Sequence, residues 1–195
     1  MSPKQEPAKT IYQLKVTLQD IDPPIWRRLL VPSNVALAKL HKIIQRAMGW
    51  EDSHLHQFLV GKQIYGTADP YGFGRGPKIL SERSHTLEQV AFRAKMKLLY
   101  EYDFGDSWLH EVLVEKVMPA DPEARYPVCL EGARACPPED CGGTPGYEDL
   151  LQAPSDPSHP EHEEIKDWVG DDFDPEALDL DKVNRSLARL RLRRP

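Results

Sequence analysis

The amino-acid sequence predicts one α+β domain, in which a mostly antiparallel β-sheet packs against a core helix and C-terminal helices. Several segments alternate apolar and polar residues, which is typical of half-buried strands, and others repeat apolar residues every three or four positions, which is typical of helices. A chain of 195 residues, with 40% hydrophobic and 29% charged residues, suits a single globular core. We expect a disordered lead-in at 1–9, the domain at 10–190 and a basic tail at 191–195.

The first third of the chain contains a predicted hairpin and the core helix. Residues 11–18 and 25–31 alternate at the strand period, and two prolines between them mark the connection. Apolar residues then recur at helical spacing over 35–48, until Gly49 ends the helix. The glycine-rich residues 64–77 lack the spacing of a dinucleotide-binding motif, and we expect them to form an exposed loop.

A second hairpin, with arms at 97–104 and 108–117, is predicted at the centre of the sheet. Each arm alternates strictly, so the register of the hairpin decides which side chains share a face. A two-residue turn would set Glu101 opposite His110 with Asp103 close by. Such a cluster is suited to acid–base chemistry or to metal binding.

A three-residue loop would pair the same arms differently. It would match Phe104 with Trp108 and Tyr102 with His110, which creates one continuous apolar face. We expect this register, because burial of a coherent apolar face usually outweighs the preference of a turn. His110 would then lie among aromatic rings, with the carboxylates on the reverse side.

The last third of the chain changes in character. Prolines and glycines interrupt residues 126–143 so often that we expect a largely irregular segment. Short helices are predicted near 149–151 and over 162–169. Apolar residues at spacings of three and four over 180–190 predict a final helix that faces the core.

Two groups of residues have the side chains that metal ions prefer. The third predicted strand, 54–60, would place His54 and His56 on one face, and paired imidazoles bind divalent metals. Their alternative role is to hydrogen-bond with neighbouring carboxylates at a sheet edge.

The second group is made of thiols. Cys129, Cys136 and Cys141 have spacings comparable to those of zinc sites, and His159 or His162 would complete a set of four. The alternative is that the cysteines are buried free thiols that anchor a compact loop.

The remaining candidates follow from residue type and position. The candidate catalytic residues lie in the central hairpin and beside the last cysteines: Asp103, Asp106, His110, Glu139 and Asp140. His110 is also a candidate metal ligand. Aromatic residues near these positions are candidates for ligand binding: Trp50, Trp108 and Tyr102. The cofactor is unknown from sequence, and a divalent metal is the one possibility that the residues indicate.

Charge and composition limit the partners. Residues 139–181 hold 15 acidic residues and one lysine, a formal charge of −14, which leaves +8 for the rest of the chain. The acidic segment would repel nucleic acid, so DNA is an unfavoured partner, and a protein or a small ligand fits better. No signal-type or membrane-spanning apolar run occurs, and an odd number of cysteines argues against a disulfide framework. We expect a cytoplasmic protein that does not bind membranes.

Five motifs occur in an order that resembles the plasmid pRiA4b Orf3-like family, over about Ile11 to Asn184. They are Asp-Pro-Pro-Ile-Trp-Arg-Arg at 22–28, Leu-His-Lys-Ile-Ile-Gln at 40–45 with Met-Gly-Trp at 48–50, His-Leu-His-Gln-Phe at 54–58, Tyr-Asp-Phe-Gly-Asp-Ser-Trp-Leu-His at 102–110 and Ala-Cys-Pro-Pro-Glu-Asp-Cys-Gly-Gly at 135–143. Members of that family are sometimes labelled as mobile-element passenger proteins of the TnpR, or resolvase, type. The resemblance implies no catalytic assignment for these positions.

Three hypotheses for function follow. The first is a binding or accessory module, associated with mobile elements or plasmids, for a protein partner or small ligand. The second is a metal-dependent hydrolase or nuclease that uses the clustered histidines and carboxylates, including Glu101. The third is a DNA transaction of the resolvase type. The third is disfavoured because a serine recombinase needs arginines around its serine and a basic DNA-binding domain, whereas this chain has an acidic C-terminal third.

Overall fold

The computed structural model describes residues 10–67, 78–153, 156, 158–170 and 173–190. Eight strands form one sheet in the order β5-β4-β3-β6-β7-β1-β2-β8, and every neighbouring pair is antiparallel except β4 and β5. The strands are β1 Thr10–Leu18, β2 Trp26–Pro32, β3 His56–Val60, β4 Gln63–Gly66, β5 Ile79–Ser81, β6 Lys97–Tyr102, β7 Trp108–Pro119 and β8 Val128–Ala133.

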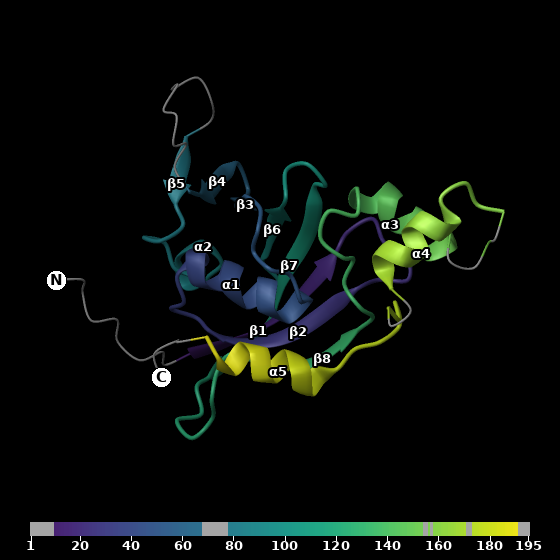
Figure 1. Ribbon diagram of the computed structural model, residues 1–195. Coiled ribbons are helices and arrows are strands. Elements are labelled where there is room, and N and C mark those ends of the chain that lie inside the picture. Colours follow the sequence, from purple (N-terminus) through teal and green to yellow (C-terminus); the bar gives the residue numbers. More distant parts are fainter. Residues whose placement is uncertain (1–9, 68–77, 154–155, 157, 171–172, 191–195) are drawn as a thin grey trace.

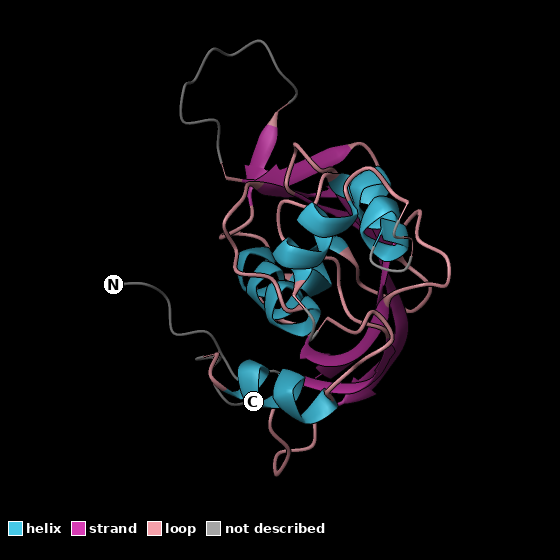
Figure 2. Ribbon diagram, turned by 45° about the vertical axis from the view of Figure 1, so that its right-hand side comes forward, coloured by secondary structure: helices cyan, strands magenta, loops and turns pink. Residues whose placement is uncertain are grey.

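The helices lie mainly against one face of this curved sheet (Figures 1 and 2). Helix α1 crosses the middle of that face, α5 runs beside β8, and α3 and α4 lie beyond the tip of the β6–β7 hairpin. Their bounds are α1 Leu37–Met48, α2 Leu87–Val90, α3 Gly143–Gln152, α4 His162–Val169 and α5 Leu180–Ala188. The predicted α+β class, with a mostly antiparallel sheet, a core helix and C-terminal helices, is confirmed.

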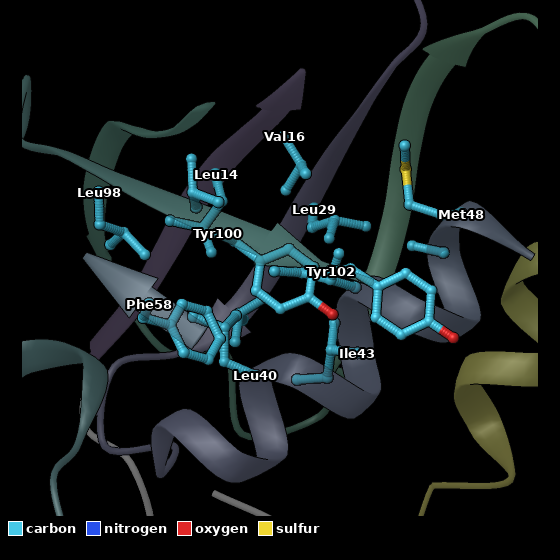
Figure 3. Close-up of a cluster of buried hydrophobic side chains, with 14 of the residues drawn as sticks. Leu14, Val16, Leu29, Leu40, Ile43, Met48, Phe58, Leu98, Tyr100 and Tyr102 are labelled. Carbon is cyan, nitrogen blue, oxygen red and sulfur yellow. The ribbon is translucent and has the colours of Figure 1, made fainter. Parts of the chain in front are cut away.

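The core lies between α1 and the inner face of the sheet (Figure 3). Leu40 and Ile43 of the helix point toward Phe58 and the ring of Tyr100, and all four side chains are fully buried. The alternation of β1 places Leu14 and its neighbours two residues away on this same face, because side chains in a strand alternate between the two faces. Burial of this face, at roughly 25 cal/mol per Å² of apolar area, is the main favourable contribution to stability.

The outer face of the sheet carries charged pairs in place of a second layer of helices. Arg28 of β2 contacts Glu115 of β7 and Glu131 of β8, and Gln13 of β1 donates to Glu115 over 2.7 Å. Lys97 pairs with Glu111 over 2.8 Å. The sheet is therefore buried on one side and polar on the other, which explains the alternating sequence pattern.

The β6–β7 hairpin buries the face that the sequence predicts but with a different pairing. Tyr102 pairs with Trp108 and Tyr100 with His110, so the arms are shifted by two residues from the expected three-residue loop. The reason lies at Asp103, which leaves the ladder with φ of 55° and donates its N–H to the Leu55 carbonyl over 2.9 Å. A shift of two preserves the faces, so the aromatic face is retained.

Three strands were not expected from the pattern. Strands β4 and β5 are short and lie next to the glycine-rich region, and β8 lies inside the segment predicted to be irregular. The third strand starts at His56 and not at residue 54. The predicted lead-in at 1–9, the tail at 191–195 and most of the glycine-rich loop, 68–77, lie outside the described residues.

None of the helices in the described part of the chain is both long enough and apolar enough to cross a membrane.

Candidate metal centre

Three loops meet at the end of the sheet where β6 passes into β7. His54 comes from the loop before β3, Asp103 directly follows β6, and Glu139 and Asp140 come from the loop between β8 and α3. The loops are held together by the Trp50 indole N–H, which donates to the Pro137 carbonyl over 2.9 Å. Side chains that are far apart in sequence therefore converge at one place.

The imidazole of His54 lies at the centre of this convergence. Its Nδ1 is 3.5 Å from an Asp103 oxygen, and its Nε2 is 3.1 Å from Asp140 and 3.6 Å from Glu139. Nε2 is buried and makes no hydrogen bond of acceptable geometry within the described part of the chain. In the described part of the chain, His54, Asp103 and Asp140 are the one group of three metal-ligating residues whose ligand atoms lie within 4.8 Å of one another. We call these three residues the candidate metal centre.

Glu139 lies beside the candidate metal centre and is held by two donors. One of its oxygens accepts from the Glu51 N–H over 2.8 Å and from the Tyr102 hydroxyl over 3.0 Å. Burial, together with the hydrogen bond to the Glu139 carboxylate, raises the pKa of Tyr102 to about 12. The hydroxyl therefore stays protonated and orients Glu139, while the N–H of Ser53 donates to the same hydroxyl oxygen over 2.9 Å.

The backbone at this site adopts an uncommon conformation. Asp52, Asp103 and Asp140 have φ values of 65°, 55° and 57°, in the left-handed region that L-residues other than Asn and Asp rarely enter. Asp103 is further fixed because its second oxygen accepts from the Gly105 N–H over 2.9 Å. Such conformations cluster at ligand-binding and catalytic sites.

The site is closed on the protein side and open on the solvent side. The side chain of Asp103 is 12% exposed and that of His54 27%, whereas that of Asp140 is 73% exposed. A cation held by these three residues would keep positions for water or substrate, as catalytic metal sites with three protein ligands do. Asp106 lies next to this group, where it accepts from the Gly142 N–H over 3.2 Å.

His56 does not join His54, contrary to the predicted pairing on one strand. The chain enters β3 only at His56, so strand alternation does not govern His54. Instead, the Nε2–H of His56 donates to the Glu82 carboxylate over 2.7 Å, and its ring stacks on that of His41 with centroids 3.4 Å apart. The alternative role, hydrogen bonding to a carboxylate, describes this geometry.

His56, Glu82 and His41 form a second cluster of polar side chains, separate from the candidate metal centre. His41 is buried, and its two ring nitrogens contact the Tyr100 hydroxyl over 2.8 Å and Asp52 over 2.5 Å. Burial, with smaller contributions from His56 and Lys42, lowers the pKa of His41 to about 3. The neutral ring then donates from Nε2 to the carboxylate and accepts the Tyr100 hydroxyl proton at Nδ1. Periodicity around residue 41 predicts a partly buried histidine, but nothing in the local sequence identifies its partners.

His110 and Trp108 lie in the aromatic core, away from the candidate metal centre. His110 is 0% exposed and packs edge-on against Trp50, with ring centroids 5.2 Å apart. Trp50 in turn stacks on Tyr102 at 5.0 Å. Of the three aromatic candidates, Trp50 and Tyr102 support the loops of the candidate metal centre, and Trp108 is buried at 2% exposure. Glu101 is on the other side of the sheet, where it accepts from Gln57 over 2.6 Å.

The cysteines are free thiols and do not assemble with histidines within the described ranges. Burial raises the pKa of Cys141 to about 12 and that of Cys136 further still, and it also raises the pKa of Cys129. These cysteines match the alternative expectation of thiols that anchor a compact loop.

The fold and these side chains define a single-domain α+β protein with a histidine–carboxylate cluster at one end of its sheet. The chain belongs to the plasmid pRiA4b ORF-3-like protein family, which matches residues 10–182.

Two relatives share nearly the whole of this fold. A protein from Sinorhizobium fredii, described as the uncharacterized protein y4hQ, is 37% identical over 179 residues, which is 91% of each chain. The crystal structure of MM3350 from Methanosarcina mazei, a protein of unknown function, superposes with a TM-score of 0.83 at 38% identity, and the match covers 91% of this chain and 98% of that one.

Proposed function

We propose that this protein binds one divalent metal ion at His54, Asp103 and Asp140 and uses it for hydrolysis. The observation that supports this most is the convergence of one imidazole and two carboxylates, from three separate loops, within 4.8 Å. Metal–ligand bonds of about 2.0–2.2 Å place neighbouring ligand atoms about 3–4 Å apart. With one ligand atom taken from each residue, the three atoms lie within 4.8 Å of one another, so a bound ion would draw them slightly closer together.

Charge supports the same proposal. Asp103, Glu139 and Asp140 place three carboxylates around one imidazole, and no lysine or arginine pairs with any of them among the described residues. Like charges at such distances repel, and a bound cation removes the repulsion. One imidazole with two carboxylates suits zinc or manganese better than calcium, which prefers oxygen ligands alone.

The surrounding residues fit a hydrolytic role. A metal ion that is bound by three protein ligands lowers the pKa of its water and so supplies a nucleophile at neutral pH. Glu139 is oriented by Tyr102 and Glu51 without being part of the candidate metal centre, so it is placed to accept a proton. Phe104 and Leu55, which directly follow Asp103 and His54 in the chain, are exposed large apolar side chains.

Metal binding is tested by titrating zinc and manganese into chelator-treated protein, with calorimetry and elemental analysis. We expect one ion per chain, and at least a tenfold weaker affinity in His54→Ala and in the isosteric Asp103→Asn. Glu101→Gln is the matched control: it removes the charge of a carboxylate two residues earlier, on β6, that is bonded to Gln57 on the other side of the sheet, and it should keep the wild-type affinity. Equal affinity in all four proteins would rule out this site.

Hydrolysis is tested on the metal-loaded protein with nitrophenyl esters and phosphodiesters. Activity that is lost in His54→Ala and reduced in Glu139→Gln supports the proposal. Stoichiometric metal without any hydrolysis contradicts the catalytic part and favours a metal-binding accessory module. Protein that binds no metal favours the first hypothesis, a module for a protein partner or small ligand.

Association with mobile elements and a role on DNA are further proposals, and the role on DNA needs an experiment of its own. A DNA transaction requires salt-dependent binding to duplex DNA that weakens when residues 191–195 are removed. The acidic residues 139–181 argue against it, because they repel the phosphate backbone.

A further inference from the structure

A cavity of about 410 Å³ lies between the C-terminal end of α1 and helix α5. Trp50 and Cys136 form the wall nearest to the candidate metal centre, and Phe173 and Val183 line the cavity elsewhere. Three cationic side chains also line it, namely Arg27, Arg46 and Lys182. The cavity shares no residue with the candidate metal centre, so its role does not depend on the proposed function.

Arg27 is the unusual member of this lining. Its side chain is nearly fully buried, with 2% of the residue exposed, and its guanidinium makes no ion pair with a carboxylate among the described residues. Four of its N–H groups donate to the backbone carbonyls of Trp26, Ala47, Ala133 and Arg134 over 2.8–3.0 Å.

A guanidinium has five N–H donors, so one donor of Arg27 has no acceptor among the described residues. A buried positive charge without an anionic partner is costly, and a ligand of opposite charge lowers that cost. Burial lowers the pKa of Arg27 from its ordinary value, which still leaves it charged at neutral pH.

We propose that this cavity, the anion cavity, binds a small organic anion with an aromatic body. The carboxylate or phosphate group faces Arg27, and Arg46 and Lys182 complete the positive side from the rim. Trp50 and Phe173 contact the aromatic body, since flat apolar groups bury well against rings. Small-molecule sites commonly combine such apolar walls with a few convergent charged groups.

Two aspartates also line the cavity, and both are already engaged by backbone donors. Asp179 caps α5 by accepting from the Lys182 N–H over 2.8 Å, and Asp174 accepts from the Glu176 N–H over 2.9 Å. These backbone N–H groups partly compensate the negative charge of the two aspartates, so the aspartates repel an anionic ligand only weakly. Asp179→Asn keeps the cap while removing the charge, so it is expected to tighten anion binding.

The experiment titrates benzoate and phenyl phosphate into ¹⁵N-labelled protein and follows the indole N–H signals. We expect a saturable shift of the Trp50 signal, with the signals of Trp26 and Trp168 unchanged. Arg46→Ala combined with Lys182→Ala should weaken binding by about tenfold or more, because two charge-assisted contacts are lost. Both positions are exposed, so the variant is expected to fold.

Two controls identify the source of any shift. Arg189→Ala removes an exposed cation at the C-terminal end of α5, opposite the end that holds Lys182; Arg189 does not line the cavity, and its loss should leave the wild-type affinity unchanged. Benzyl alcohol carries the aromatic body without the charge. The proposal is overturned if neither anion gives a saturable Trp50 shift, if benzyl alcohol binds as well as benzoate, or if the double variant binds both anions with unchanged affinity.

Discussion

At the scale of single residues, burial determines which histidines of this protein carry charge. The ring of His110 is enclosed by Tyr100 and Trp50, and its Nδ1 donates toward the carbonyls of Trp108 and Tyr100 over 3.1 and 3.3 Å. Its Nε2 has no hydrogen-bond partner among the residues that the structure describes, so a second proton there would be buried without an acceptor. Burial accordingly lowers the pKa of His110 to about 4.

This depressed pKa predicts a defined loss of stability in acid. The unfolded chain takes up the His110 proton below pH 6.5, whereas the folded protein takes it up only near pH 4. The stabilisation from burying His110 as a neutral ring is therefore fully present above pH 6.5. As the pH falls from 6.5 toward 4, the free energy of unfolding decreases by about 1.4 kcal/mol per pH unit. His110→Phe should reduce the slope of unfolding free energy against pH in this window, measured by urea unfolding at pH 7, 6 and 5.

Residue type predicts the members of the candidate metal centre as candidates, but it does not predict which candidates come together. His54, Asp103 and Asp140 are all predictable as candidates, because histidines and carboxylates next to turns are common in sites. Their grouping depends on loops that meet only in the folded sheet, so His56 and His110 were equally reasonable candidates. Glu82, the partner of His56, gave no local signal, since one acidic residue among polar neighbours is typical of a surface.

At the scale of secondary-structure elements, Arg27 joins three parts of the fold. It lies on β2, donates to the Ala47 carbonyl at the end of α1, and donates to the carbonyls of Ala133, the last residue of β8, and of Arg134 directly after it. The carbonyl at the end of a helix has no partner within the helix, so Arg27 supplies one. The elements are therefore linked by hydrogen bonds as well as by apolar contact.

Replacing Arg27 by Met is expected to lower the free energy of unfolding by about 3 kcal/mol or more. Four carbonyls lose their donor, and a buried group without a partner costs about 1–3 kcal/mol. Arg27→Lys should not restore the loss, because an ammonium does not span four separated acceptors. Arg28→Met, on the outer face of the same strand, should cost only about 1 kcal/mol or less. Guanidinium unfolding curves measure all three, and equal losses for Arg27→Met and Arg28→Met would contradict this role.

Sequence patterns predict the helices and strands that have a strong periodicity of their own. The first two strands, both arms of the β6–β7 hairpin, α1 and α4 lie close to their predicted positions, since each has a strong period of its own. Strand β8 was missed because its residues are flanked by proline and glycine and depend on pairing with β2 for their conformation. The hairpin register failed for a comparable reason, since the Asp103 turn is stabilised by Leu55 from another loop.

At the scale of the whole molecule, the uneven distribution of charge affects the stability of the folded chain. Residues 139–181 carry a formal charge of −14, and Asp140 of the candidate metal centre belongs to this segment. Folding brings a further carboxylate, Asp103, close to Asp140 and so concentrates negative charge at this place. A cation bound at His54, Asp103 and Asp140 offsets part of that concentration.

Metal should consequently raise the melting temperature of the whole domain. At a free zinc or manganese concentration about 100 times Kd, binding adds about 2.7 kcal/mol to the free energy of unfolding. For a domain of this size that corresponds to a rise of roughly 5–10 °C. Calorimetric scans with metal and with chelator measure the difference. The shift should vanish in Asp103→Asn and persist in Glu101→Gln, and a shift that survives in Asp103→Asn would place the metal elsewhere.

The assembly of the candidate metal centre from three distant loops also has a kinetic consequence. Its ligands approach one another only when the loop before β3, the end of β6 and the loop after β8 have all docked on the sheet. Contacts of such large sequence separation tend to be absent from the folding transition state. Bound metal should therefore slow unfolding and leave the refolding rate nearly unchanged, so that the ion would act mainly on the lifetime of the native state.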